Sequence, residues 1–144
     1  MDTIELLVPA GDMDKLKTAL RFGADAVYVG GQQFGLRAAA GNFNLDQLSQ
    51  AVDLTHTQGK RIYLTLNAYL RPDDFDGLDD YLEALRPLGT DGYIVSDPGV
   101  LQRIKQIDPR REIHLSTQVN TTNGYSCRFW QQQGVDRLNL AREL

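Results

Sequence analysis

The sequence is poor in the residues that build disulfides and metal centres. Its 144 residues include one cysteine, Cys127, and two histidines. A single cysteine excludes a disulfide within the chain and a metal site made only of thiolates. No His-x-His or Glu-x-x-His pair is present, so we expect no metal site formed by this chain alone.

Long hydrophobic runs and an excess of positive charge are also missing. No stretch approaches the eighteen or so apolar residues of a transmembrane helix. Fifteen basic and nineteen acidic residues give a net charge of −4, which argues against a large non-specific nucleic-acid surface but leaves room for a local RNA site. The acidic first residues lead straight into a predicted strand, unlike a secretory signal. We therefore expect a cytoplasmic protein with no membrane partner.

What the sequence does contain is a short apolar stretch followed by a helical pattern, repeated along the chain. This alternation is typical of consecutive βα units on a parallel sheet. A closed barrel of the TIM type has eight units and about 250 residues, so six units predict an incomplete α/β barrel in a single domain, residues 1–144. The predicted strands are Ile4–Pro9, Ala26–Gly30, Arg61–Asn67, Gly92–Asp97, Glu112–Gln118 and Arg137–Glu143.

Helix signals separate these strands. Asn44 and Gln47 have the spacing of a capping box, and Asp97 followed by Pro98 fits an N-cap and the first helical position. Gly59 fits a helix stop. Helices are predicted over residues 13–22, 45–58, 75–85, 98–107 and 124–133.

The active sites of such barrels lie at the carboxyl ends of the strands. Alternation in the fifth strand places His114, Ser116 and Gln118 on its inner side. Amides, a hydroxyl, arginines and carboxylates at the strand ends suit an oxygen-rich anion or the edge of a nucleobase. No nucleophile–base pair is specified, so the catalytic residues stay unassigned. The substrate-binding candidates are Arg37, Asn67, Ser96, Asp97, Gln118, Asn120, Arg142 and Glu143.

Several of these polar residues also have a purely structural interpretation. Asp97 fits a helix cap, Asn67 a turn residue, and Arg37 a solvated or ion-paired side chain. His114 lies low on its strand and fits a hydrogen-bonded core histidine, while Cys127 fits a buried structural thiol.

A family resemblance rests on blocks that run through nearly the whole chain in order. It identifies the chain as similar to the N-terminal portion of the collagenase-like peptidase family U-32. The blocks are Leu7–Asp12, Phe22–Tyr28, Gly35–Ala38, Asn42-Phe43, Val95–Gly99, His114–Asn120, Phe129-Trp130 and Leu140–Leu144.

The resemblance implies more than one kind of activity. The family is described as peptidases, some with collagenase activity, and other branches hydroxylate a uridine of tRNA or a cytidine of ribosomal RNA with prephenate as a required metabolite. A further branch supports ubiquinone hydroxylation through an iron–sulfur cluster held by cysteines. In these relatives the cysteine segment follows the sixth strand, so the resemblance implies no cofactor held within this chain. It carries over seven of the eight candidate residues, all but Ser96, as members of matching regions.

Three hypotheses remain open. The chain is a barrel portion of a family enzyme acting on RNA or peptide, or a non-catalytic binding or assembly module or truncated fragment, or an unrelated metabolite-binding βα barrel. The residues favour RNA hydroxylation over hydrolysis, because a peptidase needs an activated nucleophile or a metal-bound water. Six strands in an open sheet also predict self-association through the exposed edges.

Overall fold

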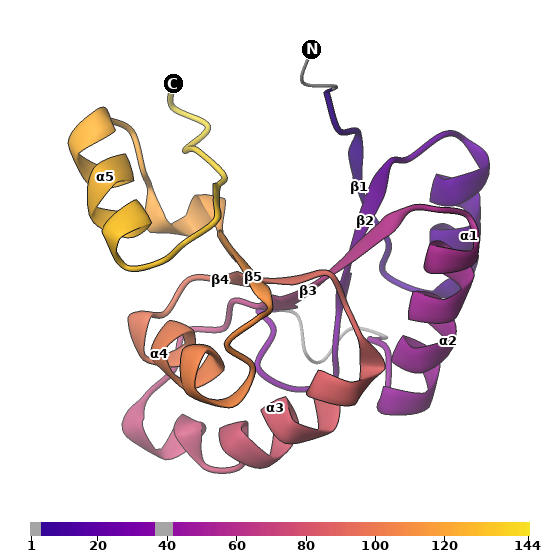
Figure 1. Ribbon diagram of the computed structural model, residues 1–144, viewed down its shortest axis with the longest axis horizontal. Helices are drawn as coiled ribbons and strands as arrows, with labels where there is room; N and C mark the ends of the chain where they lie inside the picture. The colour runs from indigo at the N-terminus through magenta and orange to yellow at the C-terminus, as the bar shows by residue number, and fades with distance from the viewer. Residues whose placement is uncertain (1–3, 37–41) are drawn as a thin grey trace.

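Six parallel strands form one sheet whose order in space is their order in the chain. The computed structural model describes residues 4–36 and 42–144. Helices lie along the outer side of the curled sheet, so the chain forms an open ring (Figure 1). The strands are β1 (Leu7–Pro9), β2 (Ala26–Gly30), β3 (Arg61–Leu66), β4 (Gly92–Val95), β5 (Glu112–Leu115) and β6 (Arg137–Leu138).

Four of the five α-helices begin at the predicted residue, and the third begins at Leu78, three residues later than predicted, because a 3₁₀ turn occupies Pro72–Phe75. Asn44 Oδ1 accepts a hydrogen bond from Gln47 N at 2.8 Å and Asn44 N donates to Gln47 Oε1 at 3.0 Å, which confirms the capping box. The α-helices are α1 (Met13–Arg21), α2 (Leu45–Thr57), α3 (Leu78–Leu85), α4 (Pro98–Ile107) and α5 (Gly124–Gln132), and three short 3₁₀ turns are η1 (Pro72–Phe75), η2 (Arg86–Leu88) and η3 (Thr117–Val119). Among the described helices, none is long and apolar enough to cross a bilayer.

The two faces of the sheet bury different residues. On β3, Ile62 and Leu64 belong to the large core between sheet and helices. Tyr63, between them, joins a small cluster on the inner face with Ala26 and Ile94. This alternation confirms the predicted orientation of the third strand. On the inner face, polar side chains lie toward both the amino and the carboxyl ends of the strands.

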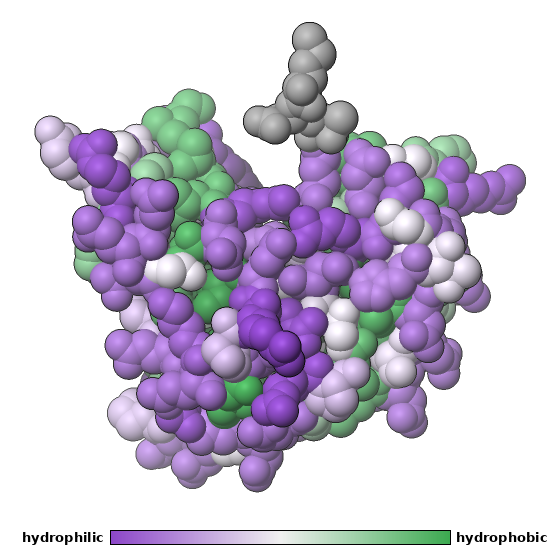
Figure 2. All heavy atoms as spheres, in the orientation of Figure 1, coloured by the Kyte–Doolittle hydropathy of each residue, from purple (hydrophilic) through white to green (hydrophobic). Residues whose placement is uncertain are grey.

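The ring is open between β1 and β6, so the fold is an incomplete barrel of the TIM type. The two ends of the chain flank this opening (Figure 1). Exposed apolar side chains include Ile4 and Leu6 just before β1, Phe129 in α5 and Leu144 after β6. Figure 2 shows the hydrophobic surface that runs along α5 and the C-terminal segment.

Five of the six predicted strands are shorter in the structure: β1 begins at Leu7, β3 ends at Leu66, β4 ends at Val95, and the fifth and sixth strands also end early. The fifth ends at Leu115, because Ser116 Oγ accepts a local hydrogen bond from Gln118 N at 3.4 Å and the chain turns into η3. Local bonds of this kind compete with the sheet ladder. The sixth ends at Leu138, after which Ala141 N donates to Thr121 O and not to a neighbouring strand.

Candidate functional site

Four polar side chains meet at the carboxyl ends of β3, β4 and β5. Gln118 Oε1 accepts hydrogen bonds from Asn67 Nδ2 at 2.8 Å, from Ser116 Oγ at 3.1 Å and from Ser96 Oγ at 3.3 Å. We call Asn67, Ser96, Ser116 and Gln118 the strand-end cluster. Three of its members are sequence-predicted site residues, and Ser116 was predicted to lie on the inner face beside them.

Parallel strands explain why residues so far apart in the chain come together. All carboxyl ends of a parallel sheet lie at the same edge, and there each strand gives way to a loop. The loop after β2 joins the cluster too, because Leu36 N donates to Asn67 Oδ1 at 3.2 Å. Ala68 N donates to Phe34 O at 3.0 Å. The second loop is thereby tied to the end of β3.

The glycines at the start of that loop are required by close packing. A Cβ atom on Gly30 would lie 3.0 Å from Asn42 Oδ1, and one on Gly31 would lie 2.1 Å from the Tyr81 hydroxyl oxygen. Phe43 N donates to Gly30 O at 3.0 Å. The glycines allow the loop to press against its neighbours, which accounts for them without a phosphate ligand.

The structure separates the remaining candidates from the strand-end cluster. Asp97 Oδ1 accepts from Gly99 N at 2.6 Å and Val100 N at 3.1 Å, so this side chain caps α4. Asn120 is exposed in a left-handed conformation (φ 54°), because η3 ends the alternation of β5 before this residue is reached.

Arg142 and Glu143 are exposed in the segment after β6. That segment runs beside the end of η3, where Ala141 N lies 3.0 Å from Thr121 O. Arg37 lies outside the described residues.

A second polar group fills the inner face at the opposite, amino end of the sheet. Arg61 Nη2 donates to Glu112 Oε1 at 2.6 Å, and Tyr63 OH donates to Glu5 Oε2 at 3.0 Å. Arg137 donates to Glu5 as well. We call this set, completed by His114, the amino-end network. The guanidinium groups of Arg61 and Arg137 both lie 5.4 Å from the centre of the Tyr63 ring.

His114 is the buried member of the amino-end network. Its Nε2 lies 3.0 Å from Glu112 Oε2, which confirms the predicted hydrogen-bonded core histidine. Burial lowers the pKa of His114, more than the Glu112 hydrogen bond raises it. Burial and the hydrogen bond to Glu5 raise the pKa of Tyr63 to about 12. The neutral imidazole donates from Nε2, and Nδ1 is a buried acceptor without a partner among residues 4–36 and 42–144.

Sequence reasoning missed the charged part of this network. Glu112, Arg61 and Arg137 each begin a strand at an inward position, which is the signal that could have found them. A charge at the start of a strand is equally typical of a solvated end, however. The network holds the sheet together at the end away from the site.

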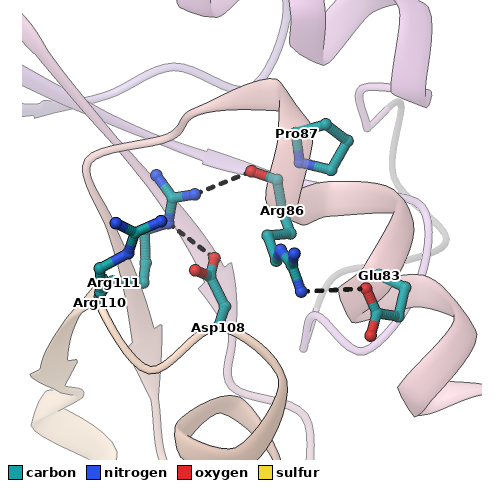
Figure 3. A pocket seen from close by; sticks show the side chains of 6 residues that line it. All are labelled: Glu83, Arg86, Pro87, Asp108, Arg110 and Arg111. Atoms are coloured by element: carbon teal, nitrogen blue, oxygen red, sulfur yellow. Dashed lines mark hydrogen bonds and ion pairs between the residues drawn. The ribbon is translucent and has the colours of Figure 1, made fainter.

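A pocket of about 680 Å³ also lies at the amino ends of the strands. It is formed by the connections that precede β4 and β5 (Figure 3). Its Arg111 donates to Asp108 Oδ2 at 2.8 Å and to Arg86 O at 2.9 Å, so this guanidinium has a structural role. Barrel active sites lie at the other end, and we therefore prefer the strand-end cluster.

The residues of this chain do not fit an iron–sulfur cluster. Such a cluster takes four ligands, usually thiolates, and Cys127 is the one cysteine of the sequence. Cys127 is half-buried in α5, less enclosed than predicted. Within residues 4–36 and 42–144, no group of three histidine, cysteine or acidic side chains could hold a metal ion. The amides and hydroxyls of the strand-end cluster instead fit an oxygen-rich organic ligand.

Known proteins are similar to this chain over nearly its whole length. The chain is 43% identical to tRNA hydroxylation protein P1 of Bacillus subtilis (strain 168), over 96% of this chain and 33% of that protein. It is 37% identical to the 23S rRNA 5-hydroxycytidine C2501 synthase of Escherichia coli (strain K12), over 98% of this chain and 21% of that protein. The chain therefore spans about a third or less of the length of these relatives.

The fold has a counterpart among solved structures. The U32 peptidase Mk0906 superposes with a TM-score of 0.77 at 15% identity, over 96% of this chain and 58% of that one. The sequence profile of Peptidase family U32 matches residues 11–144. Since that match covers nearly the whole sequence, the chain belongs to peptidase family U32.

Proposed function

We propose that residues 1–144 are a single barrel portion of a cytoplasmic protein that takes part in the hydroxylation of a tRNA uridine. In this proposal the strand-end cluster lies where RNA and prephenate are recognised. The observation that carries it is the 43% identity to a tRNA hydroxylation protein across 96% of this chain. The proposal assigns recognition to these residues and no bond-making step.

The chemistry of the strand-end cluster supports recognition of such ligands. Prephenate carries two carboxylates and a keto group, and the edge of a nucleobase offers hydrogen-bond donors and acceptors. Amides and hydroxyls held at strand ends can bind both. Arg142, exposed in the segment that runs beside η3, offers a cation to a carboxylate or a phosphate.

Peptide hydrolysis is less well supported. A serine nucleophile needs a base within hydrogen-bond reach. The hydroxyls of Ser96 and Ser116 donate to the Gln118 amide, while His114 is paired with Glu112 in the amino-end network. The arrangement suits a binding surface better than an acyl-transfer site.

Deletion of the gene and mass spectrometry of tRNA nucleosides test the proposal. We expect loss of the hydroxylated uridine, restored by the intact gene. Complementation with Asn67→Ala should restore less than a tenth of it, because Asn67 orients Gln118. As a control, Gln50→Ala on the exposed face of α2 should restore it fully. Unchanged hydroxyuridine in the deletion strain would rule the proposal out.

Hydroxylation of a ribosomal RNA cytidine is the second candidate. It rests on the 37% identity to the 23S rRNA 5-hydroxycytidine C2501 synthase. Hydroxycytidine measured in 23S rRNA from the same deletion strain decides between the two. A loss confined to ribosomal RNA would transfer the proposal to that substrate, and a purified chain that cleaves gelatin would restore the peptidase hypothesis.

A further inference from the structure

The side-chain amide of Gln118 has a set orientation, and a backbone N–H fixes it. Leu36 N–H can only donate, and it lies 3.2 Å from Asn67 Oδ1. Asn67 therefore turns its Nδ2 toward Gln118, where it meets Oε1 at 2.8 Å. The oxygen and nitrogen of an amide have nearly the same shape. The backbone donor thus decides which end of both amides faces the cluster.

Two serines reinforce this orientation. Gln118 N donates to Ser116 Oγ at 3.4 Å, which leaves the Ser116 hydroxyl proton for Gln118 Oε1 at 3.1 Å. Ser96 Oγ donates to the same oxygen at 3.3 Å. An amide oxygen has two lone pairs, and three donors already share them. A ligand that needs an acceptor finds none on Gln118 Oε1.

We infer that Gln118 is a specificity-determining residue, which presents its Nε2 hydrogens to the ligand and so selects a carboxylate oxygen. None of the four hydrogen bonds just described for Gln118 uses Nε2, and the half-buried side chain is within reach from the carboxyl end of the barrel. A group with lone pairs and no donor hydrogen satisfies such a nitrogen best. The inference rests on the proposed function, because it concerns the metabolite bound at the same cluster.

Replacement of a single atom tests this assignment. Gln118→Glu keeps the shape and an oxygen that can accept from the three donors, but it puts a carboxylate oxygen where Nε2 stands. A ligand carboxylate would then face a like charge and lose its hydrogen bond from Nε2. We expect the Kd for prephenate to rise at least about tenfold.

Calorimetric titration of the 144-residue chain with prephenate measures this change. The matched control is Gln58→Glu, the same substitution at an exposed position at the end of α2, on the amino side of the barrel. It should leave the Kd unchanged. A Kd that is also unchanged in Gln118→Glu would overturn the inference.

NMR on the unmodified chain keeps the test independent of how the variant folds. The Gln118 side-chain amide signals, assigned by their loss in Gln118→Glu, should shift on addition of prephenate and of acetate, the minimal carboxylate. If acetate shifts them and prephenate does not bind, the inference holds and the proposed metabolite is wrong. If prephenate binds and shifts only other residues, the inference is wrong and the proposed function stands. If neither shifts them and prephenate does not bind, both fail.

Discussion

At the scale of single residues, the burial of His114 makes the stability of the fold depend on pH. Its imidazole is fully buried and neutral, with Nε2 on Glu112 and no partner for Nδ1 among the described residues. A positive charge there would lie close to the guanidinium groups of Arg61 and Arg137, which help to lower its pKa.

We therefore expect the free energy of unfolding to fall as the pH drops from about 7.5 to 5.5. Below the ordinary pKa of about 6.5, the unfolded chain binds a proton at His114 that the folded chain resists, since its folded pKa is lower. The loss is at most about 1.4 kcal/mol per pH unit for one proton. Below about pH 4.5 the lowered pKa of Glu112 adds a loss of the same sign.

Urea unfolding across this pH range measures the effect. His114→Gln should flatten the dependence between pH 7.5 and 5.5. His56→Gln on α2, where the imidazole pairs with Asp91 on the surface, controls for removal of a histidine. Identical slopes for the unmodified chain and His114→Gln would contradict the assignment.

At the scale of elements, the start of α4 shows that a predicted binding residue, Asp97, can instead have a structural role as a helix cap. Asp97 accepts from Gly99 N and Val100 N, and Pro98 occupies the first helical position. Replacing such a cap with alanine typically costs about 1 kcal/mol. Asp97→Ala should lose about that much stability, and Asp97→Asn much less, because its amide oxygen can still accept.

Urea unfolding of the two variants distinguishes the cap from a binding role. Both should bind prephenate as the unmodified chain does, provided that they are fully folded. If both variants are as stable as the unmodified chain, the capping hydrogen bonds contribute nothing to stability. If Asp97→Asn binds prephenate more weakly, Asp97 belongs to the binding site.

Elements with strong local signals could be predicted from the sequence. The limits of β2 and α4 and the capping box at Asn44 were all correct. The end of β5 was not, because apolar–polar alternation continues through Ser116 and Gln118 while a local hydrogen bond turns the chain into η3. Pattern alone does not reveal which of two competing hydrogen bonds forms.

The strand-end cluster and the amino-end network also differ in how well the sequence predicts them. Parallel topology was enough to predict that Asn67, Ser96 and Gln118 lie at one end of the sheet, and the structure joins them by direct hydrogen bonds. The amino-end network was missed, although Arg61 and Glu112 begin strands at inward positions, because a charge at the start of a strand is equally typical of a solvated end.

At the scale of the whole molecule, the open side between β1 and β6 decides how the isolated chain behaves. Both strands are at the edge of the sheet, and unpaired edges with apolar neighbours favour pairing with another chain. Ile4 before β1, Phe129 in α5 and Leu144 after β6 are exposed apolar residues. We propose that the 144-residue polypeptide self-associates or unfolds more readily than its longer relatives.

Sedimentation velocity over a range of concentrations tests this. We expect the sedimentation coefficient to rise with concentration, and to rise less for Phe129→Glu, which places a charge on the open side. Phe22→Glu, at the exposed end of α1, is the matched control and should behave as the unmodified chain. A concentration-independent monomer that melts cooperatively, at a temperature as high as its longer relatives, would contradict the proposal.

The ion pair between Glu5 and Arg137 can form only late in the synthesis of this chain. Neighbouring strands of the sheet are consecutive in the chain, so β1 to β5 can pair one after another as synthesis proceeds. Glu5 precedes its partner by 132 residues, and at about 5–20 residues per second it emerges on the order of ten seconds earlier. Among the described ion pairs, this one can therefore form only after all the others have been synthesised, and Glu5 and Tyr63 lack the Arg137 guanidinium until the sixth strand arrives.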